Sequence, residues 1–508
     1  MAFPDSKIPN WVPSSVVAQA MVGILALFIL QTLYRVVTNP LSSIPGPFWS
    51  RWTNLPVKLR LLSGSKATYV HSLHERYGPV VRLGPREVDV SDVGAVREVH
   101  KARSGFLKDP GYYVGGGVRS VFSALDPVFH AQRRRVLGPC FAEAQLETLE
   151  PTIVERARLT IAKLGDEMAT AGCTDILHWW TLFAMDVISE MCFGESFHML
   201  EVGKKNQYAE DIAEMGSLLP LRGAFPWLIW LAGYVPFFPY FKNVGATRQR
   251  VVEYGTARAA QYMRLVESND SAVRKTLFSS LVAKGGGSNS QQDRKTGSPE
   301  QLSQLDITIE SQSYITAGTD TTAITLTYLI YAVLRHDAVR ARLVGELQSL
   351  PDGFTHRDLR ALPYLNLVLE ETLRLYGASQ GALPRVVPPE GAVLAGYAVP
   401  PGVVVSTQNY SLHRDGGAYP DAEKFDPSRW ENPAPEAKNA FMPFGIGPRN
   451  CIGLNLARME LRLCTALFFR AFPDVRLSSK HGMSDADMKP QINFLVMPAG
   501  HRCLVELP

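Results

Sequence analysis

The fold of this chain is decided by one stretch, Phe444-Gly445-Ile446-Gly447-Pro448-Arg449-Asn450-Cys451-Ile452-Gly453. Its three glycines allow tight backbone turns, so amide N–H groups can point at the sulfur of Cys451. The following stretch, 455–470, reads as a helix, and the positive end of its dipole lowers a thiol pKa. Arg449 adds a positive charge two residues from Cys451. The pattern predicts an anionic thiolate that binds a metal, with a buried structural cysteine as the alternative.

This loop resembles the haem-binding loop of the cytochrome P-450 family, whose pattern is Phe-x-x-Gly-x-x-Arg-x-Cys-x-Gly with minor spacing variants. Five residues stand in matching places: Phe444, Gly447, Arg449, Cys451 and Gly453. The resemblance implies a haem-thiolate monooxygenase that binds haem b, with Cys451 as the iron ligand. It also implies a mostly α fold with a small β part, formed as a single large domain.

Length and composition are compatible with such an enzyme. The chain has 508 residues, of which 46% are hydrophobic, so it can bury a large core. A net charge of +4 is weak and favours neither nucleic acid nor a polyanion as partner. The cysteines form no CxxC pair, which argues against a disulfide framework or a zinc site and favours reduced, cytosol-facing thiols. They are Cys140, Cys173, Cys192, Cys451, Cys464 and Cys503.

The N-terminal region carries a membrane signal. After a short segment, 1–15, the stretch 16–34 contains no charged residue, and its length is about enough to span a ~30 Å bilayer core. We expect a single transmembrane anchor. A secretory signal is the alternative, but no small-residue cleavage site follows. Arg35 and further basic residues after the anchor predict a single-pass protein of the endoplasmic reticulum membrane, with its catalytic domain facing the cytosol.

The rest of the chain reads as a Pro-rich hinge, 35–50, followed by one catalytic domain, 51–508. Residues 80–83 and 87–91 flank a Gly-Pro-Arg turn and predict a β-hairpin. Most of 128–280 has a helical pattern. One large, mostly helical domain is therefore expected in place of several smaller ones.

Two stretches interrupt this helical pattern. Residues 220–241 are apolar, aromatic and proline-rich, and we expect them to contact the membrane, with core packing as the alternative. The resemblance implies a lid over the substrate channel at this place. Residues 284–299 are rich in Gly, Ser, Asn and Gln and predict a disordered surface loop. Haem contacts are expected on both sides of that loop, so it does not divide the chain.

Residues 302–335 predict one very long helix with Ala317-Gly318-Thr319-Asp320-Thr321-Thr322 at its centre. Gly and Thr weaken a helix, and the Thr321 hydroxyl can bond back to the carbonyl of residue 317, which leaves a groove for O2 and water. Close helix packing through small residues is the alternative. The segment matches the P-450 motif Ala/Gly-Gly-x-Asp/Glu-Thr. The resemblance implies catalytic roles for Ala317 and Gly318, for Asp320 in proton delivery, and for Thr321 in hydrogen bonding to the activated oxygen.

An ionic triad is expected behind the haem. Glu371 and Arg374 stand three residues apart on a predicted helix, and the leucines around them indicate burial. The resemblance adds Arg429 and implies that the three residues are structural and not catalytic. Removing one partner should leave an uncompensated buried charge, at a cost of ~3–5 kcal/mol.

The resemblance also implies four partners for the haem propionates: His130, Arg134, Arg385 and Arg449. His130 and Arg134 lie four residues apart on one helix face, and His130 stands where the family often has Trp. In the run of arginines at 133–135, two are expected to be solvated.

Electrons are expected from a separate NADPH-cytochrome reductase, with cytochrome b5 as a further donor, because no reductase sequence follows Cys451. NADPH would therefore serve only indirectly. An acidic redox partner could dock on a basic face near Cys451, to which Lys438, Arg458 and Arg462 contribute.

The substrate pocket is placed by the resemblance on five largely apolar segments, which predict a hydrophobic small molecule as substrate. They are 107–121, 215–226, 315–319, 380–386 and 492–495. A weaker similarity to fungal members indicates secondary metabolite biosynthesis, with a polyketide, terpenoid or alkaloid as substrate.

Two alternatives to the monooxygenase function are a haem-thiolate isomerase or dehydratase that works without O2, and a non-enzymatic haem sensor.

Overall fold

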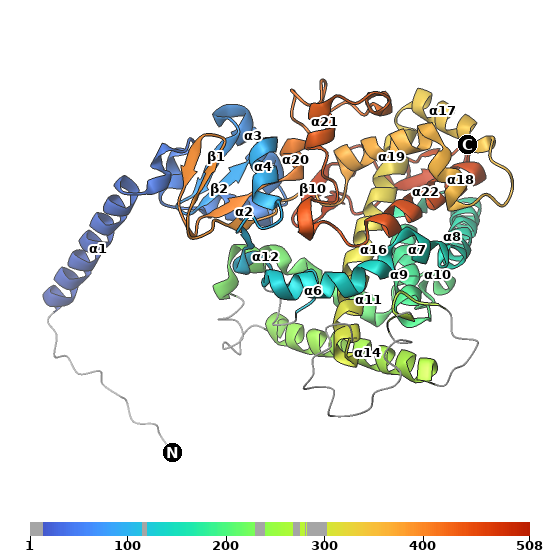
Figure 1. Ribbon diagram of the computed structural model, residues 1–508, viewed down its shortest axis with the longest axis horizontal. Helices are drawn as coiled ribbons and strands as arrows, with labels where there is room; N and C mark the ends of the chain where they lie inside the picture. Colours follow the sequence, from blue (N-terminus) through green and yellow to red (C-terminus); the bar gives the residue numbers. More distant parts are fainter. Residues whose placement is uncertain (1–13, 114–118, 229–238, 268–274, 280, 282–301) are drawn as a thin grey trace, which may run out of the picture.

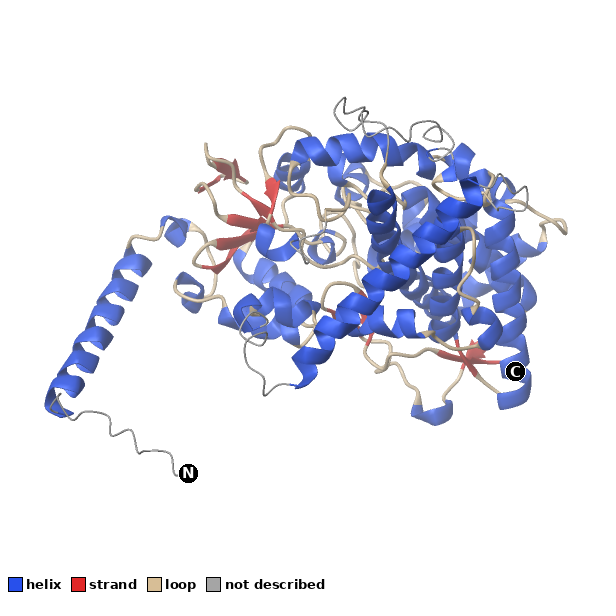
Figure 2. Cartoon of the chain, turned by 90° about the horizontal axis from the view of Figure 1, so that it is seen from below, coloured by secondary structure: helices blue, strands red, loops and turns tan. Residues whose placement is uncertain are grey.

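The computed structural model describes residues 14–113, 119–228, 239–267, 275–279, 281 and 302–508. Helices dominate this part of the chain and strands are few and short, which confirms the predicted mostly α fold with a small β part (Figure 2). The helices of eight residues or more are α1 (Ser14–Val37), α2 (Leu55–Leu62), α3 (Lys66–Tyr77), α4 (Val93–His100), α6 (Pro127–Leu137), α8 (Glu150–Ala171), α9 (Ile176–Phe193), α11 (Gln207–Ser217), α14 (Pro239–Glu267), α16 (Gln304–Leu334), α17 (Asp337–Gln348), α19 (Pro363–Tyr376) and α22 (Leu454–Ala471). Shorter helices are α5 (Pro110–Tyr113), α7 (Glu143–Glu147), α10 (Met199–Val202), α12 (Leu219–Ala224), α18 (His356–Ala361), α20 (Asn409–Leu412) and α21 (Pro435–Ala440).

The largest sheet has the strand order β1-β2-β8-β5-β3. Its strands are β1 (Val80–Gly84), β2 (Glu87–Val90), β8 (Val404–Ser406), β5 (Arg385–Val386) and β3 (Leu107–Lys108). β1 and β2 pair antiparallel, which confirms the predicted hairpin, and β3 pairs with β5 so that Lys108 lies opposite Arg385. The smaller sheets contain β4 (Thr174–Asp175), β9 (Arg476–Leu477) and β12 (Leu504–Glu506), β6 (Ala392–Leu394) and β7 (Tyr397–Val399), and β10 (Pro490–Ile492) and β11 (Val496–Pro498).

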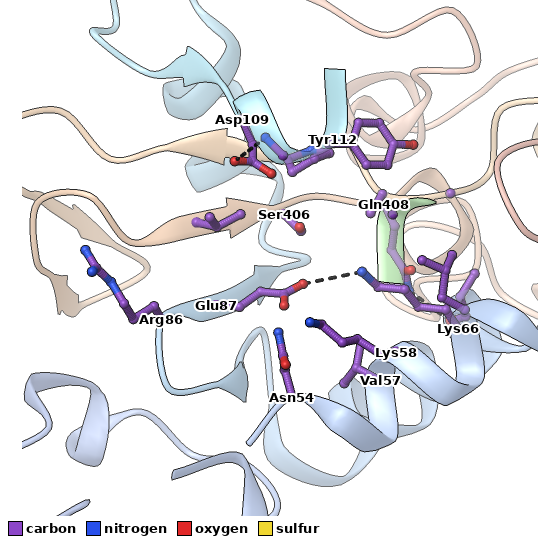
Figure 3. Close-up of a pocket in the computed structure, with 18 of the residues that line it drawn as sticks. Asn54, Val57, Lys58, Lys66, Arg86, Glu87, Asp109, Tyr112, Ser406 and Gln408 are labelled. Atoms are coloured by element: carbon purple, nitrogen blue, oxygen red, sulfur yellow. Dashed lines mark hydrogen bonds and ion pairs between the residues drawn. The ribbon is translucent and has the colours of Figure 1, made fainter. Parts of the chain in front are cut away.

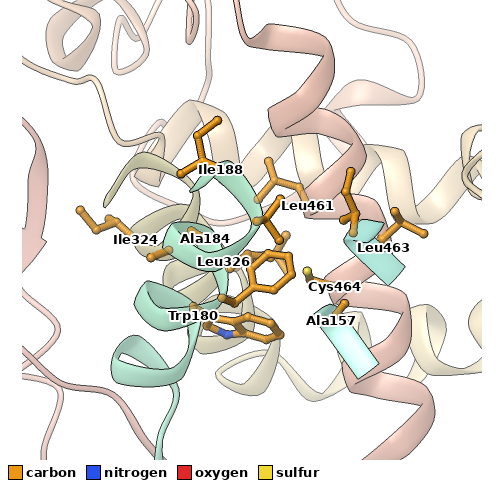
Figure 4. Packing of buried hydrophobic residues seen from close by; sticks show 14 of the residues in the cluster. Ala157, Trp180, Ala184, Ile188, Ile324, Leu326, Leu461, Leu463 and Cys464 are labelled. Atoms are coloured by element: carbon orange, nitrogen blue, oxygen red, sulfur yellow. The ribbon is translucent and has the colours of Figure 1, made fainter. Parts of the chain in front are cut away.

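The core forms around α16, which crosses the middle of the body (Figure 1). Its most extensive packing is against α9, whose residues are almost all buried, and it also packs on α14, α19 and α22. Side chains from α8, α9, α16 and α22 interlock in one cluster (Figure 4). The labelled members are Ala157, Trp180, Ala184, Ile188, Ile324, Leu326, Leu461, Leu463 and Cys464. The two helices that carry the predicted site, α16 and α22, are thus fixed to each other by the core.

The helix α1 projects from the body at its N-terminal end (Figure 1). It covers the expected stretch 16–34, and most of its described apolar side chains are exposed. Among the described residues, however, no helix has the combination of length and apolarity needed to cross a membrane. The prediction of a transmembrane span is therefore not confirmed.

Some predictions concern residues outside the described part of the chain. The surface loop expected at 284–299 lies there entirely, as do most of the N-terminal segment 1–15 and part of the expected lid, 229–238. The first part of that lid, in contrast, is described and includes the short helix α12.

Candidate functional site

Cys451 lies in a tight loop between the 3-10 helix η6 (Gly447–Arg449) and α22, which begins where a helix was predicted. The backbone N–H of Cys451 donates to the carbonyl oxygen of Phe444 (2.9 Å) and closes the loop. Gly447 has a φ of +71°, and a Cβ there would collide with the carbonyl oxygen of His100, at the end of α4. Only glycine allows the loop to turn and pack this closely.

The sulfur of Cys451 accepts a hydrogen bond from the N–H of Gly453, as the loop predicted. The sulfur is accessible to solvent but closely surrounded by protein atoms. This desolvation raises the pKa of the thiol, and the Gly453 N–H and the charge of Arg134 only partly oppose it. The prediction that the chain lowers this pKa is therefore wrong, because desolvation outweighs the favourable dipoles. A thiolate at Cys451 depends instead on a cation bound at the sulfur itself, which is what a metal supplies.

Arg449 does not point at the sulfur. Its guanidinium donates to the carbonyl oxygens of Ala124 (2.6 Å) and Leu125 (3.2 Å), and so ties the cysteine loop to the segment that precedes α6. The positive charge beside the sulfur comes from Arg134 on α6, which donates to the backbone oxygen of Asn450 (2.6 Å) and to its side-chain oxygen (2.5 Å). The predicted charge is present, but it is carried by a different arginine.

The motif of α16 has the hydrogen bond expected from its sequence. The Thr321 hydroxyl donates to the carbonyl oxygen of Ala317 (2.7 Å). Thr319 and Thr325 bond back in the same way to the residues four positions earlier. The helix remains unbroken from Gln304 to Leu334, so these side chains do not interrupt it.

One face of α16 stays accessible at the motif. Ala317 and Asp320 have exposed side chains, whereas Thr319 and Thr322 beside them are buried. The Asp320 carboxyl can be reached by small molecules but is surrounded by protein, and this desolvation raises its pKa against the influence of Lys205. A carboxyl with a raised pKa releases its proton closer to neutral pH, which suits a proton carrier.

Gly318 supports the alternative that small residues allow close helix packing. A Cβ added to it would meet the side chain of Ile188 on α9 at 3.4 Å. Gly318 thus faces the neighbouring helix, while Ala317 and Asp320 are exposed, and the oxygen-binding role of the motif stays a prediction.

The predicted ionic triad is present and fully formed. Both oxygens of Glu371 accept hydrogen bonds from Arg374 (2.8 Å each), and one of them also accepts from Arg429 Nε (2.9 Å). Glu371 and Arg374 have no exposed side-chain surface. The indole N–H of Trp430 and the backbone N–H of Asp426 complete the carboxylate's partners. Because Glu371 lies on α19 and Arg429 on η5 (Pro427–Trp430), the cluster joins two distant segments.

A second charged cluster contains mainly cations. Four of its members were predicted, His130, Arg134, Arg385 and Arg449, and Lys108 joins them because β3 pairs with β5. Burial and the charges of Arg449 and Arg385 lower the pKa of Lys108 to about 6. Burial and the charges of Arg449, Lys108 and Arg134 lower the pKa of His130 to about 3. We call these residues, Lys108, His130, Arg134, Arg385 and Arg449, the cation cluster.

Sequence reasoning missed Lys108 in this cluster. Its position is set by strand pairing with a residue far later in the chain, and a two-residue strand leaves no periodicity to read. The arginine run of α6 also differs from expectation. Arg135 is exposed as predicted for a solvated residue, but Arg133 is half-buried and forms an ion pair with Asp306 (2.5 Å) on α16.

The residues present fit haem b. A haem carries two propionate carboxylates, and the cation cluster gathers basic side chains whose charged forms a bound anion would favour. Cys451 is an accessible cysteine, in contrast to Cys140, Cys173, Cys192, Cys464 and Cys503, which are buried. Arg134 contacts the residue next to Cys451 and also belongs to the cation cluster, so the ligand loop and the anion site adjoin each other.

A cavity of about 510 Å³ lies between the largest sheet and the helices α2 and α3 (Figure 3). Four of the five predicted pocket segments reach it, through Tyr112, Pro226, Ala382 and Ile492. The fifth segment, 315–319, does not line it. The lining is more polar than expected, because it includes Lys58, Asp109 and the ion pair of Lys66 with Glu87 (3.3 Å).

The basic face expected near Cys451 is only partly free to dock a partner. Lys438 is exposed on α21. Arg458, in contrast, forms a two-bond ion pair with Glu370 (2.5 and 3.0 Å), and the half-buried Arg462 donates to Asn366 (2.8 Å). Burial and the charge of Arg458 lower the pKa of Arg462 to about 10.

Comparisons with known proteins identify the family. A family model described as Cytochrome P450 matches residues 44–505. The cytochrome P450 monooxygenase tazI of Aspergillus terreus is 43% identical over 492 residues, which cover 96% of this chain and 98% of that protein. The cytochrome P450 monooxygenase orf2 of Aspergillus niger is 40% identical over 95% of this chain and 96% of its own length. Tryprostatin B 6-hydroxylase of Aspergillus fumigatus is 31% identical over 91% of this chain and 79% of its own length. The chain therefore belongs to the cytochrome P450 family, as a monooxygenase that uses haem b.

Proposed function

We propose that this monooxygenase oxidises a hydrophobic small molecule in fungal secondary metabolism, with electrons that come from NADPH through a separate reductase. The observation that carries the proposal is the pairing of an accessible Cys451 in a tight loop with the Thr321 and Asp320 motif on the central helix. Haem b, when bound, supplies the activation of O2 and the insertion of one oxygen atom into the substrate.

The chain's own residues hold the cofactor and move protons. Cys451 would provide the thiolate ligand, and the cation cluster would hold the propionates. Asp320 would pass protons from the Lys205 side toward the accessible face of α16, because its raised pKa lets it both take up and release them. The Thr321 hydroxyl donates to Ala317, and its oxygen would accept a hydrogen bond and so fix a water or oxygen species on that face.

The substrate class is supported by the cavity and by one relative. Tryprostatin B 6-hydroxylase is named for the hydroxylation of a small molecule. The cavity combines apolar residues such as Val57 and Ile492 with Lys58 and Asp109, which would suit a mainly hydrophobic compound with polar groups, such as a polyketide, terpenoid or alkaloid. We propose that this cavity is the route by which the substrate enters.

Electron delivery requires a docking face. We propose that an NADPH-cytochrome reductase, and cytochrome b5 as a further donor, approach the side of Cys451 where Lys438 is exposed. Charge reversal at Lys438 should then slow reduction at low salt more than at high salt. Arg462 should contribute less to docking than its sequence position suggested, because it is half-buried and bonded to Asn366.

We also propose attachment to the endoplasmic reticulum membrane through α1, with the catalytic body in the cytosol. The support is the exposed apolar surface of α1 and of the adjoining segment. This surface includes Ile24, Leu27, Leu30, Phe48, Trp49, Trp52, Leu55 and Leu59. Apolar surface of this extent is typical of a membrane or protein contact. Flotation with liposomes should carry the full chain upward, and removal of residues 1–38 should weaken that association.

The proposed function is tested by deleting the gene in its fungal host and restoring it as wild type or as Cys451→Ala. In the deletion strain we expect the oxidised metabolite to be lost and a precursor with less oxygen to accumulate. The wild-type gene should restore the oxidised metabolite, whereas Cys451→Ala should leave the strain like the deletion strain. Microsomes with the wild-type protein should convert the accumulated compound only with NADPH and O2. Conversion without NADPH would contradict the proposal and would favour a haem-thiolate isomerase or dehydratase.

A further inference from the structure

We propose that Glu310 is a positioning residue for the passage of the substrate. From the central helix α16 it holds residues 120–125, which we call the bridging segment, between the entry cavity and the face of α16 that carries Ala317 and Thr321. Glu310 belongs to none of the sequence motifs that indicate the site. Its assignment rests on the proposed use of the cavity in Figure 3 as the route of the substrate.

Glu310 is fully buried and binds one N–H of the bridging segment. Both of its carboxylate oxygens accept from the backbone N–H of Val121, at 3.0 and 3.2 Å. Burying a carboxyl group costs free energy unless hydrogen bonds satisfy it. The contact with Val121 therefore compensates part of the cost of this buried acid and fixes the segment to α16.

Arg133 also acts on Glu310, but it is bound mainly to another residue. Its Nε lies 3.7 Å from a carboxylate oxygen of Glu310, which is beyond hydrogen-bond distance. A terminal nitrogen of the same guanidinium lies 2.5 Å from Asp306. Asp306 is thus the main partner of Arg133, and the Glu310 carboxylate is directed to Val121.

The position of Glu310 on α16 connects the bridging segment with the motif. At spacings of three, four and four residues, Glu310 is followed on one helix face by Ser313, Ala317 and Thr321. The Ser313 hydroxyl also contacts the bridging segment, because it donates to the hydroxyl of Ser120 (3.3 Å). The segment therefore covers the same helix face that carries the motif, about two turns nearer the N-terminus.

The other side of the bridging segment reaches the entry cavity. The ring of Phe122 packs edge to face on Phe494, and Phe494 contacts Tyr112, which lines the cavity (Figure 3). At the end of the segment, the arginine of the cysteine loop holds two carbonyl groups. A displacement of Val121 would therefore move the neighbouring Phe122 and change the wall of the passage.

This arrangement indicates which property of a ligand depends on Glu310. A ligand that travels from the cavity to the motif passes the bridging segment, so a segment that is held in place limits the width of what can pass. Small ligands should pass whether or not the segment is held. Loss of the Glu310 contact should therefore speed the entry of bulky ligands and leave that of small ligands unchanged.

A charge role is the competing explanation, in which Glu310 serves only to neutralise Arg133. Two substitutions separate the roles. Glu310→Gln keeps an acceptor oxygen at the same reach and removes the charge, whereas Glu310→Asp keeps the charge and withdraws both oxygens by one methylene group. Asp306→Asn is the matched control, because it removes the carboxylate that lies nearer to Arg133.

The first measurement is hydrogen exchange of the Val121 amide in the full chain. If Glu310 holds the segment, Glu310→Asp should exchange about tenfold faster than wild type, whereas Glu310→Gln and Asp306→Asn should stay close to it. Unchanged exchange in Glu310→Asp would overturn the proposal. Fast exchange in Glu310→Gln would overturn it in favour of the charge role, and this outcome decides even if Glu310→Asp does not fold.

The second measurement tests the passage itself. Ethyl and tert-butyl isocyanide carry no net charge, differ in bulk and bind reduced haem, so their association rates report entry. Glu310→Asp should bind tert-butyl isocyanide about tenfold faster than wild type and ethyl isocyanide at the same rate, while Glu310→Gln matches wild type with both.

Equal acceleration of both isocyanides in Glu310→Asp, or of neither, would overturn the role in passage. The proposed function fails in a different way. A wild type without the red-shifted Soret band of the reduced, CO-bound state would refute the haem-thiolate site, whereas hydrogen exchange at Val121 needs no haem and would still test the contact with Glu310.

Discussion

The Glu371 triad and the cation cluster are both buried groups of basic side chains, yet they differ in what compensates them. In the triad, one carboxylate accepts from Arg374, Arg429, Trp430 and a backbone N–H, so the chain supplies every charge it needs. In the cation cluster, the neighbours that act on Lys108 and His130 are themselves cations. From this difference we propose that the first group holds the fold together and that the second is the place for an anionic ligand.

The largest expected effect comes from breaking the complete cluster. Glu371→Gln should lower the free energy of unfolding by ~3–5 kcal/mol, because Arg374 would remain buried without its counter-charge. The matched control is its neighbour, Glu370→Gln, since the pair of Glu370 with Arg458 is partly exposed on both sides. The control should cost less than about 1 kcal/mol. Denaturant titration of both variants checks the comparison, and equal losses would contradict it.

The cation cluster should respond differently to a charge deletion. Arg385→Met should lower the free energy of unfolding of the haem-free protein less than Glu371→Gln does, because the charge of Arg385 lowers the pKa of Lys108 and so opposes its charged form. The same variant should lose haem about tenfold faster than wild type. A strong destabilisation of the haem-free protein would show that Arg385 is structural, like Arg374.

A smaller, functional effect is expected on α16. Thr321→Ala should keep the haem but reduce product formed per NADPH by about tenfold, with the lost electrons found as hydrogen peroxide. Thr325→Ala removes the same kind of hydroxyl one turn later, where it donates to the carbonyl oxygen of Thr321 (2.7 Å). This control should form as much product per NADPH as the wild type. Peroxide and NADPH assays on both variants decide whether position 321 is special.

The smallest expected effect is a pH dependence of stability at Glu310, an acidic side chain near Arg133 that belongs to neither cluster. Burial raises the pKa of Glu310 to about 7, although Arg133 and the Val121 N–H oppose it. The folded protein thus holds this proton to a higher pH than the unfolded chain does, so Glu310 should reduce stability as the pH rises from about 4.5 to about 7.

Glu310→Gln should remove this decrease of stability with rising pH. Asp306 also interacts with Arg133, but its pKa moves in the opposite direction. Burial opposes its ionisation, while hydrogen bonds from Arg133 and Ser303 lower its pKa overall. Asp306→Asn should therefore remove stability that the wild type has at neutral pH and loses on acidification. Unfolding curves between pH 4 and pH 8 test both predictions. If both substitutions changed the pH dependence of the free energy of unfolding in the same direction, the result would be inconsistent with these assignments.

The parts of the site that short motifs encode could be predicted from the sequence. The loop around Cys451, the long helix with its Thr321 back-bond, the hairpin β1–β2 and the Glu371 triad are present as expected. Most of these depend on backbone turns or on spacing along one helix, which act over a few residues, whereas Arg429 of the triad was supplied by the resemblance to the family. The sequence alone could identify them because the physical cause is local.

The parts that depend on tertiary packing could not be predicted. Arg449 turns to Ala124 and Leu125 and leaves Arg134 beside the sulfur, and Arg133 pairs with Asp306 where solvation was expected. Lys108 enters the cation cluster only through strand pairing. The thiol pKa was predicted with the wrong sign because burial, which depends on the whole fold, outweighs the local dipoles.

The central claim is that Cys451 supplies the thiolate ligand of a haem, and the most direct measurement is the reduced, CO-bound absorption spectrum of the protein in microsomes. The wild type should show a strongly red-shifted Soret band, and Cys451→Ala should lose it while Cys464→Ala, a change at a buried cysteine on the helix that follows the Cys451 loop, keeps it. A histidine-type Soret band in the wild type, or an unchanged band in Cys451→Ala, would contradict the account.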